Sequence, residues 1–265
     1  MLKILVLAAL PQEYAHFRRI TPRWLLLCAR PYKKYSHFLA DREIVLIETG
    51  MGKNFAVDAF WSALAGARPD LVVFAGFAGG LHAGLAVGRV CVVRETMLLD
   101  AAANPGDQAF TFRFSHELSE FLAAKQIRPV TAVTVSAPPD KRALSPLAAE
   151  GPAVIDMETA RVAEFASRLR LPFLSFRAVS DALDDELGFD LGDITGKRGK
   201  VDILKVLMTI IRNPPAVRAF YRSWRRSALA GKNLGLILAD FLNLPADTLL
   251  SIAGESPIER TERAG

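Results

Sequence analysis

Two stretches of the sequence decide the fold: Asp156-Met157-Glu158-Thr159-Ala160 and, further along the chain, Arg177-Ala178-Val179-Ser180-Asp181. In the first stretch, acidic residues stand where a short strand pattern passes into a helix pattern. In the second, an acidic residue ends an apolar strand pattern. Glu13 stands just past another apolar stretch, residues 2–9. Ligands of open α/β sheets bind at the carboxyl ends of the strands, so we expect Glu13, Glu158 and Asp181 to share one edge of a sheet.

The segments around these stretches alternate between two hydrophobic periodicities. Strand patterns cover residues 2–9, 43–49, 71–75, 89–94, 130–136, 153–155 and 173–179, and helix patterns cover 54–67, 115–125 and 157–169. This alternation predicts a mostly parallel sheet that is covered by helices. Gly76-Phe77-Ala78-Gly79-Gly80 ends one strand, either as a tight turn or as backbone that approaches a ligand closely. Residues 100–114 are expected to form a polar loop.

The character of the chain changes after Asp181. Residues Lys197 to Lys232 hold ten Lys or Arg and one acid, a local charge of +9 that leaves −4 for the rest of a chain of net charge +5. Helix patterns cover 201–212, 215–230 and 233–242, with a break expected at Gly231. We therefore expect an α/β domain over 1–192, a basic amphipathic helical extension packed on it over 193–253, and a disordered tail over 254–265.

Composition narrows the class of protein. With 265 residues, 51% of them hydrophobic, the chain can bury a full core. Cys28 and Cys91 are far apart in apolar contexts and are expected to be buried free thiols of a cytoplasmic protein. The histidines are scattered without zinc spacing, so we expect no metal. We interpret the apolar N-terminal stretch as a buried strand rather than a signal peptide, and we expect no transmembrane helix.

The three acids suit one kind of chemistry. Carboxylates without a neighbouring nucleophile can cleave a bond to a sugar, because one acid protonates the leaving group while another handles water. Each acid also has a simpler explanation. Glu158 could be a first-turn acid that the helix dipole stabilises. Asp181 could cap the turn that follows its strand. Glu13 could be an exposed residue in the first turn of a helix. Only their expected meeting at one sheet edge favours the chemical interpretation.

Several motifs recur, in order, in one known family: Glu13, Gly50-Met51-Gly52-Lys53, Pro69-Asp70, Gly76–Leu81, Val87-Gly88-Arg89-Val90 and the two acidic stretches. Over residues 2–190 the chain resembles the nucleoside phosphorylase superfamily, in its methylthioadenosine/S-adenosylhomocysteine nucleosidase-like branch. From Gly192-Asp193 onward it resembles the hopanoid-associated members, which remove adenine from adenosylhopane, a 5′-lipid-substituted adenosine. The resemblance implies a single α/β phosphorylase/hydrolase-like domain with a central twisted mixed sheet flanked by helices, extra C-terminal basic helices, and a homodimer.

The resemblance also implies roles for the acids. Asp181 would give a proton or hydrogen bond to purine N7, oriented by Ser180, and burial or a neighbouring acid would help it to hold that proton. Glu158 would accept hydrogen bonds from the ribose 2′- and 3′-hydroxyls. Met157 would pack against ribose or base. Glu13 would position and activate the attacking water, with no covalent intermediate and no cofactor.

Other substrate contacts follow from the same resemblance. Ala78, Gly79 and Phe77 would line the pocket, and Phe189 would contact the 5′ substituent. Members of the family that use phosphate place an arginine and a serine where this chain has Phe74 and Phe77. Since a phosphate dianion needs cationic or multiple N–H partners, this departure favours hydrolysis. Lys53 or a residue of a partner subunit could still supply charge. The segment Ala137–Lys141, which lies near the base in the family, departs from its pattern.

The basic extension carries two stripes at helical spacing, an apolar one at Val217, Phe220, Tyr221 and Trp224 and a basic one at Arg218, Arg222, Arg225 and Arg226. The stripes fit a helix that packs on the core. They also fit an interfacial helix that touches anionic lipid through residues 201–230. Nucleic-acid binding is less favoured, because no nucleic-acid fold signature accompanies the charge.

The sequence thus predicts a cytoplasmic nucleosidase that releases adenine from a 5′-substituted adenosine, small or lipid-like. A lipid-linked substrate such as adenosylhopane would place it in hopanoid biosynthesis and at the membrane surface. The alternatives are a methylthioadenosine/S-adenosylhomocysteine nucleosidase, a purine nucleoside phosphorylase and an inactive nucleoside-binding relative. Glu13, Glu158 and Asp181 together argue against an inactive protein.

Overall fold

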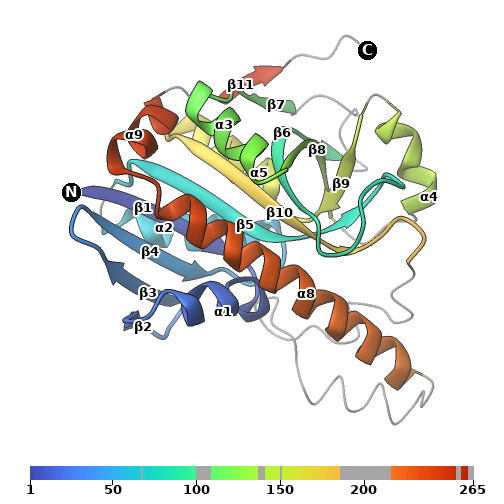
Figure 1. Cartoon of the computed structure of the whole chain (residues 1–265), viewed down its shortest axis with the longest axis horizontal. Helices are drawn as coiled ribbons and strands as arrows, with labels where there is room; N and C mark the ends of the chain where they lie inside the picture. The colour runs from blue at the N-terminus through green and yellow to red at the C-terminus, as the bar shows by residue number, and fades with distance from the viewer. Residues whose placement is uncertain are drawn as a thin grey trace.

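The computed structural model describes residues 1–66, 68–99, 109–136, 141–149, 151–185, 216–254 and 258–261 (Figure 1). Its strands are β1 (Leu2–Ala8), β2 (Leu25–Cys28), β3 (Lys33–Phe38), β4 (Arg42–Glu48), β5 (Leu71–Gly80), β6 (Val90–Leu99), β7 (Ala109–Phe112), β8 (Arg128–Val135), β9 (Ala153–Asp156), β10 (Phe173–Asp181) and β11 (Ile258–Thr261). Its helices are α1 (Pro11–Ile20), α2 (Lys53–Leu64), α3 (His116–Ala124), α4 (Lys141–Leu144), α5 (Thr159–Arg168), α8 (Ala216–Leu242) and α9 (Ala246–Gly254), with a 3₁₀ turn at Ser145–Ala148.

The strands form one mixed sheet in the order β11-β7-β6-β8-β9-β5-β1-β4-β3-β2, with β10 inserted between β5 and β6. The pairings β5–β10, β10–β6, β6–β8, β8–β9 and β9–β5 close a ring of five strands. β1, β4, β5 and β10 run parallel. The predicted α/β class with a mixed, helix-flanked sheet is confirmed, although antiparallel pairings are too frequent for a mostly parallel sheet.

Helices cover both faces of the sheet. One core cluster joins α1, α3, α8 and α9 to it, and the other joins α2 and α5 to the opposite face. Figure 1 shows α8 crossing the sheet and its first turns continuing beyond the strands. The described part of the C-terminal region therefore supplies core, through Leu234, Leu238 and Phe241.

Two predictions about glycines are wrong. The sequence predicts that a strand ends before Gly76, but β5 continues to Gly80 because β10 and β9 supply hydrogen-bonding partners. It also predicts a helix break at Gly231, but α8 runs through that residue without interruption. A Cβ at Gly231 would lie 2.3 Å from the carbonyl oxygen of Gln12, so the glycine serves the close approach of α8 to α1.

Three further expectations are corrected. Residues 109–112 and 258–261 are paired strands, not a loop and a disordered tail, because each covers the open edge of its neighbour. Cys28 is exposed, since its edge strand β2 is exposed along its whole length, whereas Cys91 is buried as expected.

Among the described residues no single helix has the length and hydropathy to cross a membrane, and only α8 with α9, a pair bent by 99°, passes that test jointly by length and composition.

Candidate active site

Glu13 lies in the first turn of α1 and is buried. Its Oε2 accepts hydrogen bonds from the backbone N–H of Ala9 (2.6 Å) and Leu10 (2.8 Å), and its Oε1 accepts one from Phe77 (2.9 Å). Burial raises the pKa of Glu13, against these hydrogen bonds and the charge of Arg177, which lower it. The interpretation of Glu13 as an exposed first-turn residue is therefore wrong.

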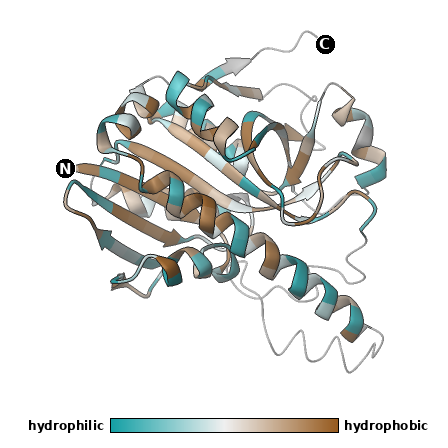
Figure 2. Cartoon of the chain, in the orientation of Figure 1, coloured by the Kyte–Doolittle hydropathy of each residue, from teal (hydrophilic) through white to brown (hydrophobic). Residues whose placement is uncertain are grey.

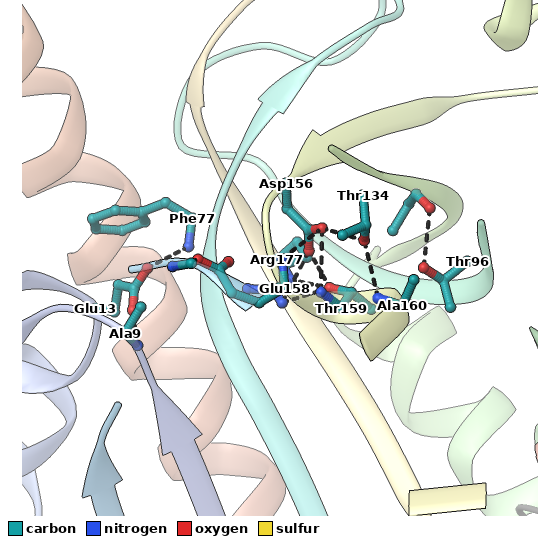
Figure 3. A network of polar contacts seen from close by, with 12 residues as sticks. Ala9, Glu13, Phe77, Thr96, Thr134, Asp156, Glu158, Thr159, Ala160 and Arg177 are labelled. Atoms are coloured by element: carbon teal, nitrogen blue, oxygen red, sulfur yellow. Dashed lines mark hydrogen bonds and ion pairs between the residues drawn. The ribbon is translucent and has the colours of Figure 1, made fainter. Parts of the chain in front are cut away.

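Glu158 stands at the start of α5 and is also buried. It does not cap its own helix. Its Oε1 accepts a hydrogen bond of 2.6 Å from the N–H of Gly52, at the start of α2. Burial, and then the charge of Asp156, raises the pKa of Glu158 to about 7, while Arg177 and the Gly52 hydrogen bond lower it. Figure 3 shows the Glu158 side chain reaching toward Glu13, whose charge also raises its pKa.

Asp156, rather than Glu158, accepts hydrogen bonds from the backbone at the start of α5. Its Oδ1 accepts hydrogen bonds from the N–H of Glu158 (3.4 Å) and Thr159 (3.3 Å), and from the hydroxyl of Thr134 (2.6 Å). Its Oδ2 lies 3.0 Å from Nη2 of Arg177, and both side chains of this ion pair are 1% exposed. Because Asp156 holds the helix start, the Glu158 carboxylate is available for other contacts.

Arg177 crosses β5 at Gly76. A Cβ on Gly76 would lie 2.2 Å from Nη1 of Arg177 and 3.1 Å from Oε1 of Glu13, so glycine is needed where the two side chains approach the strand. The guanidinium carbon lies 4.1 Å from the ring centroid of Phe74. The position where phosphate-using members carry an arginine is thus filled by a buried ring beneath a guanidinium that is already paired.

Asp181 ends β10, and its carboxylate carries two side-chain contacts. Its Oδ1 accepts a hydrogen bond of 2.6 Å from the Ser180 hydroxyl, and its Oδ2 contacts Nζ of Lys141. Both members of the ion pair are 14% exposed. The charged partner at Asp181 is therefore a lysine rather than the expected second acid. The resemblance places the segment Ala137–Lys141 near the base but gives Lys141 no role, and no local pattern pairs this residue of a four-residue helix with an acid 40 residues later.

The other predicted residues fall around these acids. Met157 is half-buried between Asp156 and Glu158, and Phe77 is half-buried at the end of β5. Ala78 is buried, and its carbonyl oxygen accepts a long hydrogen bond of 3.4 Å from the Ser180 hydroxyl. Glu13 and Asp181 both lie against the last residues of β5, at Gly76 and Gly79. Phe189 lies outside the described residues.

Within the described ranges, no group of three or more His, Cys, Asp or Glu side chains is arranged to hold a metal ion. The acids of the site are instead held by backbone N–H groups, hydroxyls and cationic side chains. This arrangement gives two buried carboxylates with raised pKa values and one ion-paired carboxylate around the last residues of β5. Such a set can accept a proton from water, stabilise positive charge on a sugar and donate to a leaving group.

The expected shared carboxyl edge is wrong in one respect, because β9, which leads to Glu158, runs antiparallel to β5. A mixed α/β sheet that brings buried carboxylates together around the last residues of one strand is typical of enzymes of the nucleoside phosphorylase type. The family model described as "Phosphorylase superfamily" matches residues 3–212. The chain belongs to the phosphorylase superfamily, which confirms the resemblance read from its motifs. The narrower resemblance to hopanoid-associated members stays a prediction.

The proteins to which the chain is similar include nucleosidases and a futalosine hydrolase. The chain is 32% identical over 164 residues, 56% of its length and 71% of the relative's, to a 5′-methylthioadenosine/S-adenosylhomocysteine nucleosidase of Actinobacillus succinogenes. Two solved structures from Helicobacter pylori share the fold with a TM-score of 0.68. One is a 5′-methylthioadenosine/S-adenosylhomocysteine nucleosidase in complex with a small molecule (15% identity, 91% of this chain and 98% of that one). The other is a futalosine hydrolase (14% identity, 91% and 97%).

Proposed function

We propose that this protein is an N-glycosyl hydrolase that cleaves the bond between ribose and base in a 5′-substituted adenosine and releases adenine. The observation that carries the proposal is the pair of buried carboxylates, Glu13 and Glu158, held near the last residues of β5, the strand that also carries Phe74 and Phe77. Its relatives' names support the reaction class, since they are nucleosidases that act on adenosine derivatives.

Glu13 serves as the base for water. Three backbone N–H groups fix its carboxylate, and one acceptor position on Oε1 remains for a water molecule. Burial raises its pKa, which strengthens it as a proton acceptor near neutral pH. The water that it activates attacks C1′ of the sugar.

Glu158 serves the sugar. Gly52 occupies one position on Oε1, and the remaining acceptor positions suit the 2′- and 3′-hydroxyls. Hydrogen bonds from those hydroxyls tighten as the ring takes on oxocarbenium character, so their effect is largest in the transition state. Met157 packs beside the sugar or base in this arrangement.

Asp181 serves the leaving base. Ser180 fixes one oxygen of its carboxylate, and a proton delivered to N7 turns adenine into a better leaving group. Ala78, Gly79 and Phe77 line the space between this acid and Glu13, and Phe189 is assigned to the 5′ substituent.

Hydrolysis is favoured over phosphorolysis by charge. Phe74 and Phe77 offer no cation, and Arg177 is committed to Asp156 and Thr159. A bound phosphate dianion would also face the buried carboxylates of Glu13 and Glu158. A purine nucleoside phosphorylase is therefore the less supported reading.

A lipid-linked substrate such as adenosylhopane, and hence a place in hopanoid biosynthesis, is the finer proposal. Its support is the exposed half of α8, where Val217, Tyr221 and Trp224 are 46%, 58% and 62% exposed next to Arg218 and Arg222. Figure 2 shows polar and apolar residues alternating along this half of the helix. An aromatic stripe beside a basic stripe on one helix suits an anionic lipid surface. We therefore propose that the protein visits the membrane surface, and from the family resemblance we propose that it is a cytoplasmic homodimer.

Adenine release tests the proposal. Methylthioadenosine and a long-chain 5′-alkyl adenosine would each be incubated with the protein, with and without phosphate. We expect release without phosphate, and faster release from the alkyl substrate. Preference for methylthioadenosine would favour the methylthioadenosine/S-adenosylhomocysteine nucleosidase reading, and release only with phosphate would favour a phosphorylase. No release would leave an inactive nucleoside-binding protein.

Vesicle flotation tests the membrane contact. The protein is expected to float with vesicles that contain phosphatidylserine and not with pure phosphatidylcholine. The double variant Tyr221→Ser, Trp224→Ser should lose this binding, while Leu250→Ser, which removes an exposed leucine on α9, should keep it. Equal binding by all three proteins would contradict an α8 contact.

A further inference from the structure

Lys141 occupies the carboxyl end of β10, beside the acid that serves the leaving base. Its Nζ contacts Oδ2 of Asp181 and donates a hydrogen bond of 2.8 Å to the carbonyl oxygen of Ala182, with a longer one of 3.4 Å to the carbonyl of Asp181. The ammonium is thus held by the end of the strand as well as by the carboxylate. Because both side chains are 14% exposed, this pair is far better shielded than an ordinary surface ion pair.

The backbone of β5 is shaped around this pair. A Cβ on Gly79 would lie 2.9 Å from Oδ2 of Asp181, 2.9 Å from Cγ2 of Ile155 and 3.0 Å from Cε of Lys141. A side chain at that position would therefore displace the carboxylate, the lysine stem or the side chain of Ile155. The glycine therefore serves the lysine as much as the acid, which is unexpected if Lys141 were only a surface residue of α4.

We infer that Lys141 is a positioning residue for the proposed reaction: it holds the Asp181 carboxylate and supplies the proton that Asp181 passes to the purine. The inference rests on the proposed function. Ser180 binds one oxygen of the Asp181 carboxylate and Lys141 binds the other, so the carboxylate is fixed in place before substrate binds. A fixed donor at the point where charge develops is what leaving-group protonation requires.

Cleavage of the bond between ribose and base requires one proton to reach the purine and one to leave the attacking water. A proton moves from the Lys141 ammonium to the Asp181 carboxylate and on to N7 of the purine. The bond between C1′ and N9 breaks, and its electron pair goes to the purine. The oxygen of water bonds to C1′, and the proton that this water loses goes to Glu13. Solvent then returns a proton to Lys141 and removes one from Glu13.

The test compares two leaving groups on one sugar. Methylthioadenosine needs a proton on the departing base, whereas 4-nitrophenyl 5-methylthioriboside releases a stable anion. We expect Lys141→Met to lower kcat for adenine release by about 10²-fold or more, the usual range for acid catalysis, and to leave nitrophenol release nearly unchanged. Lys141→Arg keeps a cation beside Asp181 but cannot release a proton, so it should recover only the part of the loss that comes from holding the carboxylate. Lys125→Met, which removes an ion pair to Asp240 on α8, is the matched control.

Each outcome decides the inference. Equal losses on both substrates, or no loss on either, would overturn it and leave the nucleosidase proposal standing. If Lys141→Met fails to fold, the decision passes to Lys141→Arg in an Asp181→Asn background, which should add no further loss for two residues that act as a unit. An additive loss would count against it. A wild-type protein that releases neither product would remove the proposed function, and this inference with it.

Discussion

The free energy of unfolding should depend on pH through Glu158, because its pKa differs between the folded and the unfolded chain. Its pKa is raised from 4.5 to about 7, so between these values the folded state holds more protons than the unfolded chain. The free energy of unfolding should therefore fall as pH rises from about 4.5 to about 7. Glu158→Gln removes this titration and should make the fall with pH shallower in urea unfolding at several pH values, while Glu13, whose pKa is also raised, keeps part of the slope.

Two comparisons complete that test. Glu120→Gln, at a side chain that is 69% exposed, should leave the pH profile of the wild type in place. Glu158→Gln should also lower kcat for adenine release by about 10²-fold or more, because the amide binds the hydroxyls without the charge that the transition state needs. A wild-type profile that rises over the same pH window would contradict the assignment of a raised pKa to Glu158.

Gly76 is the residue on which the inner network depends. Gly76→Ala places a methyl group 2.2 Å from Nη1 of Arg177, which would displace the guanidinium from Asp156. Breaking a buried ion pair costs about 3–5 kcal/mol, so the free energy of unfolding should drop by that order and activity should be lost. Denaturant unfolding measures the change. Gly254→Ala, where an added Cβ meets nothing within 4 Å, should be nearly neutral, and equal effects of the two changes would contradict the packing.

At the scale of elements, the contact between α8 and α1 controls where Glu13 lies. In an isolated helix, replacing glycine by alanine stabilises by roughly 1 kcal/mol. At Gly231 the new methyl group would meet the carbonyl of Gln12, next to Glu13. We therefore expect Gly231→Ala to destabilise the protein and to lower kcat, in urea unfolding and in the adenine assay. A stabilised, fully active variant would show that α8 does not press on α1.

Periodicity predicted the elements that carry a clear apolar pattern, even where their partners lie far away in sequence, as those of β10 do, and it missed the hairpin strands β2 and β3 although they pair with each other. The buried strands β1, β4 and β10 and the helix α3 with its Ser115 cap appear where the patterns place them. The glycine end of β5, the uninterrupted α8 and the strand β11 depend on distant segments that no local pattern records. Lys141 was missed for the same reason, while Glu13, Glu158 and Asp181 were found because they directly follow or interrupt apolar patterns.

At the scale of the whole molecule, the C-terminal helices α8 and α9 form part of the hydrophobic core. Leu234, Leu238, Phe241, Leu249 and Ile252 are fully buried in the cluster that includes α1 and β1. Removing the chain from Ala216 onward would expose this face of the sheet, at about 25 cal/mol per Å² of apolar surface. We expect the truncated protein to be insoluble or unfolded by circular dichroism. A truncated protein that folds cooperatively would show that the chain before Ala216 folds independently.

Because α8 packs against the first elements of the chain, those elements cannot complete their packing until α8 has been synthesised. Arg42 binds the carbonyl oxygen of Leu242, 200 residues later, and Glu13 lies beneath a helix that leaves the ribosome long after it. The strand β1, which leads to Glu13, therefore stays without its covering helix while most of the chain is synthesised. Long waits of this kind slow folding and leave apolar strands open to wrong partners. The protein should accordingly depend on chaperones more than its size suggests, and should gain yield when translation is slowed by cooling.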